Sequence, residues 1–271
     1  MPQLWTFDPP AAARSVPAEA AAALLDVASG AAAADGLLRA VQAVVPADYL
    51  SLVRVRRDQP ELLEGSARRP GEASVVSQCF GIYRRHYYRR DALLPLAAQL
   101  ARAPTTGMAV LHCRAADFPD AGWRSEIYER ERLTDRFSLV HAPLPGQAHA
   151  IHLYRDDRLG PLQPDEIDRL LGLAPLLCQA QALAWRAQDR REDLDARIAG
   201  HTQRLARLAP TLSPRECAVC ARIAQGMTVD GIAVDLDVAP STVVTLRKRA
   251  YLKLAGAGLP AERLGLARLL H

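Results

Sequence analysis

Helix-start and helix-stop signals follow one another closely near the C-terminal end of the sequence, and this pattern restricts the fold more than any other feature. Residues 213–216 read Ser-Pro-Arg-Glu, a capping box in which a hydroxyl and a carboxylate pair with the free N–H groups of a helix start. Gly226 is of the type that ends such a helix, Thr228 can cap a second, and Pro240 can open a third. Two short helices joined by a tight turn at residues 237–239 predict a helix-turn-helix.

The excess positive charge of the chain gathers on the third of these helices. The whole chain has 34 basic and 30 acidic residues and a net charge of +4, of which residues 209–271 hold +3. Ser241 to Leu254 contains four basic residues and no acidic one. A basic helix displayed in this way fits the major groove of DNA, with cations against phosphates and short side chains against base edges. A solvated basic helix face is the alternative that charge alone leaves open.

The same segment resembles the DNA-binding domain of LuxR-type transcriptional regulators, in which the pattern runs L-T-x-R-E, glycine, E-I-A, T-V-K-x-H and K-L. The matching residues are Leu212-Ser213-Pro214-Arg215-Glu216, Gly226, Ile232-Ala233, Leu236, Val238, Thr242-Val243 and Lys253-Leu254. The resemblance implies an all-α helix-turn-helix domain at residues 209–271. It also implies that the third helix reads DNA and that a fourth helix, at residues 260–270, contributes to dimerisation.

The resemblance further implies which side chains touch DNA. Base edges are expected at Val244, Thr245 and Lys248, and phosphates at Thr242, Arg247, Arg249 and Lys253. Three positions depart from the family pattern: Val244 replaces the usual Lys, Leu246 the usual His, and Ala239 the Ser that caps the third helix. A missing cap costs a helix about 1 kcal/mol, and an apolar Val244 favours contact with a thymine methyl group. We therefore expect a target sequence that differs from the family's usual one.

Lysine is almost absent, with Lys248 and Lys253 the only two in the chain. The residues before them therefore hold no P-loop, no protein-kinase lysine and no Schiff-base lysine for pyridoxal phosphate. The motifs H-E-x-x-H, G-x-S-x-G and G-x-G-x-x-G are missing as well. We expect no catalytic residues, no cofactor and no enzyme, and an enzyme-like N-terminal domain is the weakest alternative. LuxR-type domains are usually driven by a receiver, an ATPase or a ligand-binding domain, and the first two need a lysine, which leaves a sensor that binds a ligand or a partner protein.

The N-terminal part predicts an α+β sensor domain in which a mostly antiparallel sheet is flanked by helices. Helices are expected at residues 17–45 and 72–101, and strands at residues 49–55, 61–66, 107–112, 136–143 and 148–154, the last two forming a hairpin. We place this domain at residues 17–162, after a loose Pro/Ala-rich arm at residues 1–16.

A helical pattern from Pro164 to Leu208 predicts a linker at residues 163–208. Its second half spaces residues as in the a and d positions of a heptad: Leu194, Ile198, His201, Leu205 and Leu208. Two interpretations fit this seam equally well, a short parallel coiled coil with a second chain and packing against the chain's own sensor domain.

Aromatic residues beside an aspartate make the best candidate for a ligand pocket. The stretch from Tyr83 to Asp91 resembles the Y…Y-x-x-x-D-P pattern of autoinducer-binding domains, in which aromatic residues and the Asp meet the lactone head group. The resemblance implies ligand contacts at Tyr87 and Asp91, and we add the aromatic neighbours Tyr83 and Trp123 as candidate ligand-binding residues.

Other interpretations of these residues stay open. Residues 123–128 and 153–155 resemble GAF- and PAS-like sensors, without locating a pocket. The aromatic side chains fit an ordinary core equally well, and Asp91 then serves a structural ion pair with Arg89 or Arg90.

The remaining motifs predict no metal site. Cys217 and Cys220 form one C-x-x-C without a second pair or a histidine at zinc-finger spacing. On a helix, Cys220 is expected in the core and Cys217 outside. His149 and His152 differ by three on an expected strand and so point to opposite faces, which excludes joint ligation.

Together these patterns predict a cytoplasmic, dimeric, quorum-sensing-like transcription regulator gated by a small-molecule ligand. The expected partners are double-stranded DNA with an inverted-repeat operator, a second copy of the chain, the ligand and RNA polymerase, without a membrane. The five cysteines, the absence of a signal-peptide pattern and the absence of a long apolar segment support this location. The alternative is a LuxR-type regulator that is ligand-independent or gated by a partner protein.

Overall fold

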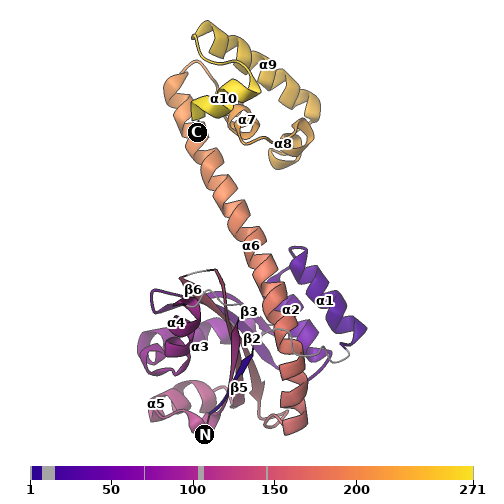
Figure 1. Cartoon of the computed structure of the whole chain (residues 1–271), viewed down its shortest axis with the longest axis vertical. Helices are drawn as coiled ribbons and strands as arrows, with labels where there is room; N and C mark the ends of the chain where they lie inside the picture. The colour runs from indigo at the N-terminus through magenta and orange to yellow at the C-terminus, as the bar shows by residue number, and fades with distance from the viewer. Residues whose placement is uncertain (1, 8–15, 70, 103–106, 145, 271) are drawn as a thin grey trace. The chain divides into compact units, whose positions relative to one another are not determined.

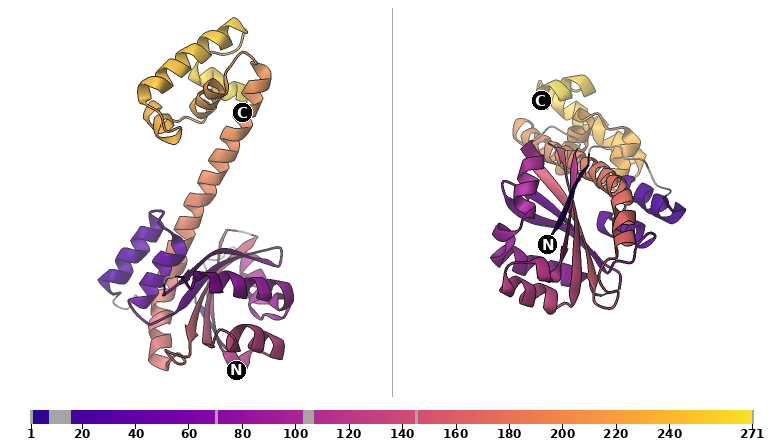
Figure 2. Two further views of the ribbon diagram at one scale, coloured as in Figure 1. Left: turned by 180° about the vertical axis from the view of Figure 1, so that it is seen from behind. Right: turned by 60° about the horizontal axis from the view of Figure 1, so that its bottom comes forward.

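The chain forms two compact units, Met1–Arg186 and Ala187–His271. The computed structural model describes residues 2–7, 16–69, 71–102, 107–144 and 146–270 (Figure 1). The N-terminal unit is a sheet with helices on both faces, and the C-terminal unit is all helical (Figure 2). This is the α+β plus all-α architecture that the sequence predicts.

The sheet of the N-terminal unit has six strands in the order β1-β4-β5-β6-β2-β3, and every neighbouring pair is antiparallel. The strands are β1 (Gln3–Phe7), β2 (Tyr49–Arg56), β3 (Gln59–Ala67), β4 (Met108–Arg114), β5 (Leu133–Leu144) and β6 (Gln147–Asp156). Arg57 and Asp58 have positive φ angles and turn the chain between β2 and β3, which is the conformation that tight hairpins require.

One prediction is wrong at the start of the chain. The segment at residues 1–16 was expected to be a loose arm, but Gln3–Phe7 form β1, which pairs with β4 at the edge of the sheet. Five residues next to prolines carry little strand signal by themselves, and the hydrogen bonds that stabilise them come from a strand about a hundred residues away in the sequence. Residues 8–15 lie outside the described part of the chain.

Helices cover both faces of the sheet (Figure 1). One face carries α1 (Ala18–Ala28), α2 (Ala33–Gln42) and the first part of α6 (Pro164–Leu208). The other face carries α3 (Ala73–His86), the short turn η1 (Tyr88–Arg90), α4 (Leu93–Arg102), the turns η2 (Ala115–Asp117) and α5 (Ala121–Trp123), and the π-helical turn η3 (Arg124–Glu129).

Strand β6 shows how the alternation of side chains separates the two faces. His149 and Ile151 point to the side of α6, whereas His152 and Tyr154 point to the side of α3. The two histidines therefore lie on opposite faces, as the sequence predicts.

Helix α6 belongs to both units, so the predicted linker is not a segment of its own. Its first part buries Leu170, Leu173 and Leu177 in the core of the N-terminal unit. Its second part buries Ile198 and Leu205 in the core of the C-terminal unit.

Two positions of the heptad seam of α6, Ile198 and Leu205, are thus covered by the chain's own C-terminal unit, whereas Leu208 at its end is 43% exposed. A coiled coil would need the side chains of Ile198 and Leu205 to face a second chain, but they are buried here at 7% and 0% exposure. The other reading, packing on the sensor domain, is wrong because the partners of this seam come from the C-terminal unit.

The C-terminal unit also contains four shorter helices: α7 (Pro214–Ala224), α8 (Val229–Asp235), α9 (Pro240–Gly256) and α10 (Arg263–Leu270). The capping box of α7 is formed on both sides, since Ser213 Oγ accepts from the Glu216 N–H (3.3 Å) and Glu216 Oε2 accepts from the Ser213 N–H (2.7 Å). Thr228 Oγ1 caps α8 through the Gly231 N–H (3.1 Å). Ala239 precedes α9 without a side-chain cap. Within the described residues, no helix combines the length and the apolar character needed to cross a bilayer.

Candidate DNA interface and ligand pocket

Helix α9 is anchored on one side and exposed on the other. Val243, Ala250 and Leu254 are fully buried and fix the helix against α7 and α8. On the opposite side of the helix, the expected base-contacting positions Val244, Thr245 and Lys248 are all exposed. Val244 is 42% exposed. The Thr245 hydroxyl donates to the Ser241 carbonyl (2.9 Å), so it is already engaged within the helix.

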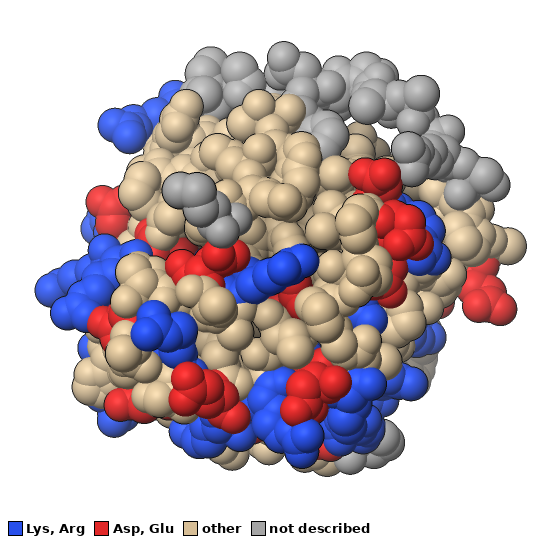
Figure 3. Space-filling view, turned by 90° about the horizontal axis from the view of Figure 1, so that it is seen from below, with Lys and Arg blue, Asp and Glu red and all other residues tan. Residues whose placement is uncertain are grey.

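The cations of α9 fall into two groups. In the described part of the chain, Arg247, Lys248 and Arg249 form no ion pair with a carboxylate, so their charge is available to a polyanion. Thr242, which is also expected to contact phosphate, is half-buried in the first turn of the helix. By contrast, acidic and basic side chains are interspersed on the face of the molecule drawn in Figure 3.

Lys253, another expected phosphate contact, forms an ion pair within the C-terminal unit. Its Nζ lies 2.7 Å from Oε2 of Glu216, whose side chain is only 4% exposed. Burial would raise the pKa of Glu216, but Lys253 and the capping contacts with Ser213 hold it below its ordinary value. Lys253 therefore ties α9 to the start of α7, and its contact with phosphate stays a prediction.

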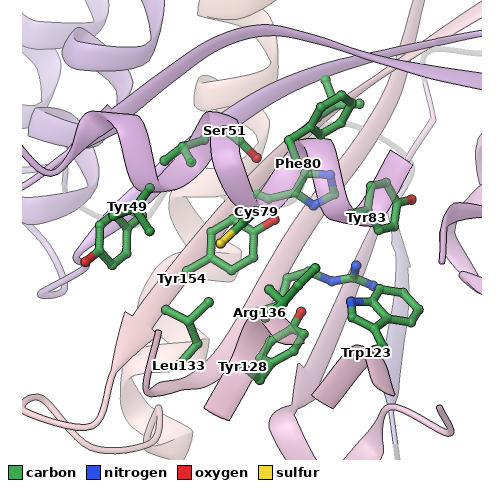
Figure 4. Close-up of a pocket in the computed structure, with 15 residues that line it drawn as sticks. Tyr49, Ser51, Cys79, Phe80, Tyr83, Trp123, Tyr128, Leu133, Arg136 and Tyr154 are labelled. Atoms are coloured by element: carbon green, nitrogen blue, oxygen red, sulfur yellow. The ribbon is translucent and has the colours of Figure 1, made fainter. Parts of the chain in front are cut away.

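An aromatic pocket opens between α3 and the sheet of the N-terminal unit (Figure 4). Six of its lining side chains are aromatic rings, from strands, α3 and the turns after β4: Tyr49, Phe80, Tyr83, Trp123, Tyr128 and Tyr154. The polar lining groups are Ser51, Cys79, Arg136 and His152. The cavity measures about 50 Å³, which is room for a few water molecules.

An ion pair between Arg136 and Asp91 lies at one wall of this pocket, and both side chains are almost fully buried. Arg136 donates from Nη1 to Asp91 Oδ2 (2.8 Å) and from Nη2 to Oδ1 (2.9 Å). The same guanidinium lies 4.9 Å from the ring centre of Phe118 and 5.7 Å from that of Trp123. This is the planar, bidentate and stacked geometry that only arginine provides.

Two further donors complete the surroundings of the Asp91 carboxylate. The Tyr83 hydroxyl donates to Oδ2 (3.1 Å) and the Leu93 N–H donates to Oδ1 (3.1 Å). Burial by itself would raise the pKa of Asp91, but Arg136 and the Leu93 N–H hold it below its ordinary value. Burial and the Asp91 charge raise the pKa of Tyr83 well above its ordinary value, so this phenol stays protonated and donates.

The four residues expected to bind a ligand lie in one cluster but not in equivalent positions. Tyr83 and Trp123 line the cavity. Tyr87 is stacked on Trp123, at 5.8 Å between ring centres and 6° between planes, and supports it from behind. Asp91 lies behind Arg136. The structure thus brings the candidates together, while ligand binding by them stays a prediction.

The alternative pairing of Asp91 with Arg89 or Arg90 is wrong. Arg90 forms an exposed ion pair with Asp120, and Arg89 donates to the Tyr88 hydroxyl (3.0 Å). Both arginines are exposed, whereas Arg136 belongs to strand β5 and is buried.

Sequence reasoning missed Arg136, Tyr128 and His152 as pocket residues. The sequence did hold one indication of Arg136. It is a charged residue at the start of an expected strand, where inward-facing residues are normally apolar. His152 shares this wall, with Nδ1 2.9 Å from Ser138 Oγ. Burial and the nearby Arg136 charge lower the pKa of His152 to about 3, so its imidazole is neutral.

The cysteines form no reactive or metal-binding cluster in the described residues. Cys217 was expected outside the core, but it is 2% exposed and packs between α7 and its neighbours, as does Cys220. Burial raises the pKa of both thiols, that of Cys220 to about 12.

Comparison with known proteins identifies the family of the C-terminal unit. The family model described as bacterial regulatory proteins, luxR family, matches residues 210–260. The C-terminal unit is a luxR-family helix-turn-helix domain. A stretch of 52 residues is 54% identical to the probable transcriptional regulatory protein NarL of Mycobacterium tuberculosis, from strains CDC 1551 and H37Rv, and covers 19% of this chain and 24% of each relative. The luxR-type match therefore spans about a quarter of the length of these curated relatives.

Three solved structures share a remote similarity with the chain. The N-acylhomoserine lactone dependent factor CepR2 of Burkholderia cenocepacia is 18% identical with a TM-score of 0.43, over 59% of this chain and 89% of that one. The LBD domain of VqsR from Pseudomonas aeruginosa is 14% identical with a TM-score of 0.45, over 62% and 95%. SdiA of Escherichia coli is 18% identical with a TM-score of 0.40, over 87% and 90%.

Proposed function

We propose that the protein is a DNA-binding transcriptional regulator that acts in the cytoplasm as a homodimer. The exposed face of α9 carries this proposal, because it presents three uncompensated cations around the short side chains of Val244 and Thr245 on a rigidly anchored helix. Inserted in the major groove, such a face contacts phosphates at its rim and base edges at its centre.

Substitutions on α9 test DNA binding directly. Lys248→Ala should weaken binding to a selected high-affinity site about 10- to 100-fold, because a base contact is worth about 1–3 kcal/mol. Arg249→Ala should weaken binding to all sequences and lower the slope of log affinity against log salt by about one. Fluorescence anisotropy on sites enriched from a random DNA library measures both effects. Arg204→Ala, an exposed arginine of α6, is the matched control; an equal loss for all three variants would contradict a reading role for α9.

We further propose that a small molecule in the aromatic pocket gates this activity. The pocket combines aromatic walls with a few convergent polar groups, which is the usual composition of a ligand site. Occupancy would change how the N-terminal units pair in the dimer and hence the spacing of the two α9 helices on an inverted-repeat site. The small volume of the cavity favours a second candidate function. In it, side chains fill the core of the N-terminal unit, and a partner protein gates the regulator in place of a small molecule.

Native mass spectrometry of the purified chain separates these two candidates. A co-purified small molecule is expected on the wild type and not on Cys79→Phe, because a ring at Cys79 would fill the cavity from α3. Gln78→Phe, exposed on the same helix, should retain the molecule. A bare wild-type chain whose DNA affinity is unchanged by small-molecule extracts would favour gating by a partner protein.

A further inference from the structure

Two surface segments of the N-terminal unit carry a dense group of arginines. Residues 84–90, at the end of α3 and in η1, hold four arginines and a histidine, a denser basic run than that of α9. Residues 56–59, where β2 turns into β3, hold two more. Five of these six arginines are exposed and form no ion pair with a carboxylate in the described part of the chain, whereas Arg90 is paired with Asp120. These five are the arginine patch: Arg56, Arg57, Arg84, Arg85 and Arg89.

Hydrogen bonds to one tyrosine hold the two segments side by side. Gln59 Nε2 donates to the Tyr88 hydroxyl (3.2 Å), and Arg89 Nε donates to the same oxygen (3.0 Å). The Arg89 guanidinium also lies 5.5 Å from the centre of the Tyr88 ring. Because the Tyr88 oxygen accepts from both neighbours, its own O–H proton remains available to an acceptor outside the protein. The patch therefore presents a hydroxyl donor together with its guanidinium groups.

The electrostatic potential around Tyr88 is positive. The hydrogen bonds from Gln59 and Arg89, with the charges of Arg89 and Arg84, lower the pKa of its phenol. Asp58 is the one acidic residue in the two segments. Apart from the patch and Asp58, residues 1–208 hold 21 basic and 24 acidic residues, so the patch is a concentration of positive charge in an otherwise slightly acidic part of the chain.

Local structure accounts for only part of this charge. A helix C-terminus favours cations, but its dipole is equivalent to about half an elementary charge, and α3 has Arg84, Arg85 and His86 in its last turn. Arg56 and Arg57 lie at a hairpin turn, where no helix end compensates their charge. Like charges held together in this way repel one another, and an anion bound from outside would relieve the repulsion.

The patch lacks the apolar side chains that other kinds of partner require. None of the exposed large hydrophobic residues in the described chain belongs to residues 56–59 or 84–90. Protein interfaces have an apolar core, and amphipathic membrane anchors insert apolar side chains beside their cations. Guanidinium groups bind phosphate oxygens by paired hydrogen bonds without such a core. A luxR-family domain in the same chain brings DNA, and therefore a high effective concentration of phosphates, to this unit.

We propose that the arginine patch binds the sugar-phosphate backbone of DNA, as a second and sequence-independent contact in addition to that of α9. The proposed function assigns DNA contact to α9 alone, so this surface goes beyond it, while relying on α9 to bring the DNA. The contact adds affinity at every sequence and leaves the choice of sequence to α9.

Removing two patch arginines from different segments tests this contact on the full chain. The slope of log affinity against log salt measures phosphate contacts, at about 0.9 for each. Arg56→Gln combined with Arg84→Gln should therefore lower the slope by about two and weaken binding about tenfold at low salt, measured by fluorescence anisotropy on a selected site with long flanking sequence. The loss should be equal on unrelated DNA, whereas Lys248→Ala should lose affinity mainly for the selected site.

A control pair removes the same charge from arginines that already have carboxylate partners. Arg39 and Arg169 are exposed and paired with Asp26 and Asp165. Arg39→Gln combined with Arg169→Gln should therefore leave the salt slope unchanged. An equal drop in slope for both pairs, or no drop for the patch pair, would overturn the inference while leaving DNA binding by α9 intact.

Two further outcomes separate the patch from other assignments. A wild-type chain that binds no DNA would refute the proposed function and, with it, this second contact. Binding of the wild type to phosphatidylserine vesicles that is lost in the patch pair, with an unchanged salt slope on DNA, would assign the patch to a membrane surface and overturn the inference.

Discussion

Arg136→Met should destabilise the N-terminal unit by about 3–5 kcal/mol at neutral pH, because it leaves the buried Asp91 carboxylate without its counter-charge. The substitution removes two charge-assisted hydrogen bonds and the stacking of the guanidinium on Phe118. All three tryptophans, Trp5, Trp123 and Trp185, lie in the N-terminal unit. Tryptophan fluorescence during urea unfolding therefore follows this unit separately from the DNA-binding unit.

Two companion variants show whether the loss comes from the buried charge. Arg90→Met removes an exposed partner of Asp120 and should leave the unfolding midpoint nearly unchanged. Adding Asp91→Asn to Arg136→Met removes the orphaned charge and keeps an acceptor for the Leu93 N–H, so the double variant should recover more than half of the loss. A double variant as unstable as Arg136→Met alone would mean that packing, and not charge, determines the effect.

The helix-turn-helix was predictable because its signals are local. The capping box at Ser213, the turn at Asp237 and the buried stripe of α9 all depend on residues within one or two helical turns of each other. The alternating strands and the hairpins of the sheet follow from similarly short patterns, and each strand that was predicted is present within a few residues.

The features that the sequence did not predict depend on partners far along the chain. Asp91 and Arg136 are 45 positions apart in the sequence. The residues around Asp91 do not reveal that its partner is this distant arginine, since Arg89 and Arg90 lie much nearer in the sequence. Strand β1 forms only because the edge of β4 is free to receive it. The heptad seam of α6 correctly indicated a buried face, but a seam does not specify its partner, and the core of the C-terminal unit covers Ile198 and Leu205.

Acidification should destabilise the N-terminal unit well before its carboxylates titrate. Burial lowers the pKa of His141 to about 4 and those of His149 and His152 to about 3, from an ordinary value of 6.5. Because these pKa values are lower in the folded unit than in the unfolded chain, the unfolded chain binds more protons than the folded unit below pH 6.5. Lowering the pH therefore favours the unfolded state. Stability should thus be constant above about pH 7 and fall by about 1.4 kcal/mol per pH unit for each histidine as the pH drops from 6.5 toward 4.

His149 offers the clearest single-site test of this dependence. Its ring is fully buried against Trp185, at 4.8 Å between ring centres, and neither nitrogen has a hydrogen-bond partner among the described residues. Arg54 stacks on the same Trp185 ring and, with His141, further disfavours a positive charge there. His149→Phe removes two unsatisfied polar atoms while keeping a ring, so it should stabilise the unit by about 1 kcal/mol at neutral pH.

The pH dependence of unfolding distinguishes the loss of a titrating group from a simple gain in packing. At pH 5 the advantage of His149→Phe should grow by about 2 kcal/mol, because the variant no longer takes up a proton on unfolding. His141→Phe should flatten the dependence by a similar amount but destabilise the unit at neutral pH, since His141 Nε2 lies 2.6 Å from Gln181 Oε1 and its loss leaves that oxygen unpaired. Fluorescence-monitored urea unfolding between pH 7 and pH 5 measures both variants. If the free energy of unfolding depended on pH in the same way for the wild type and His149→Phe, His149 would not be held neutral in the folded unit. This result would contradict the lowered pKa of His149.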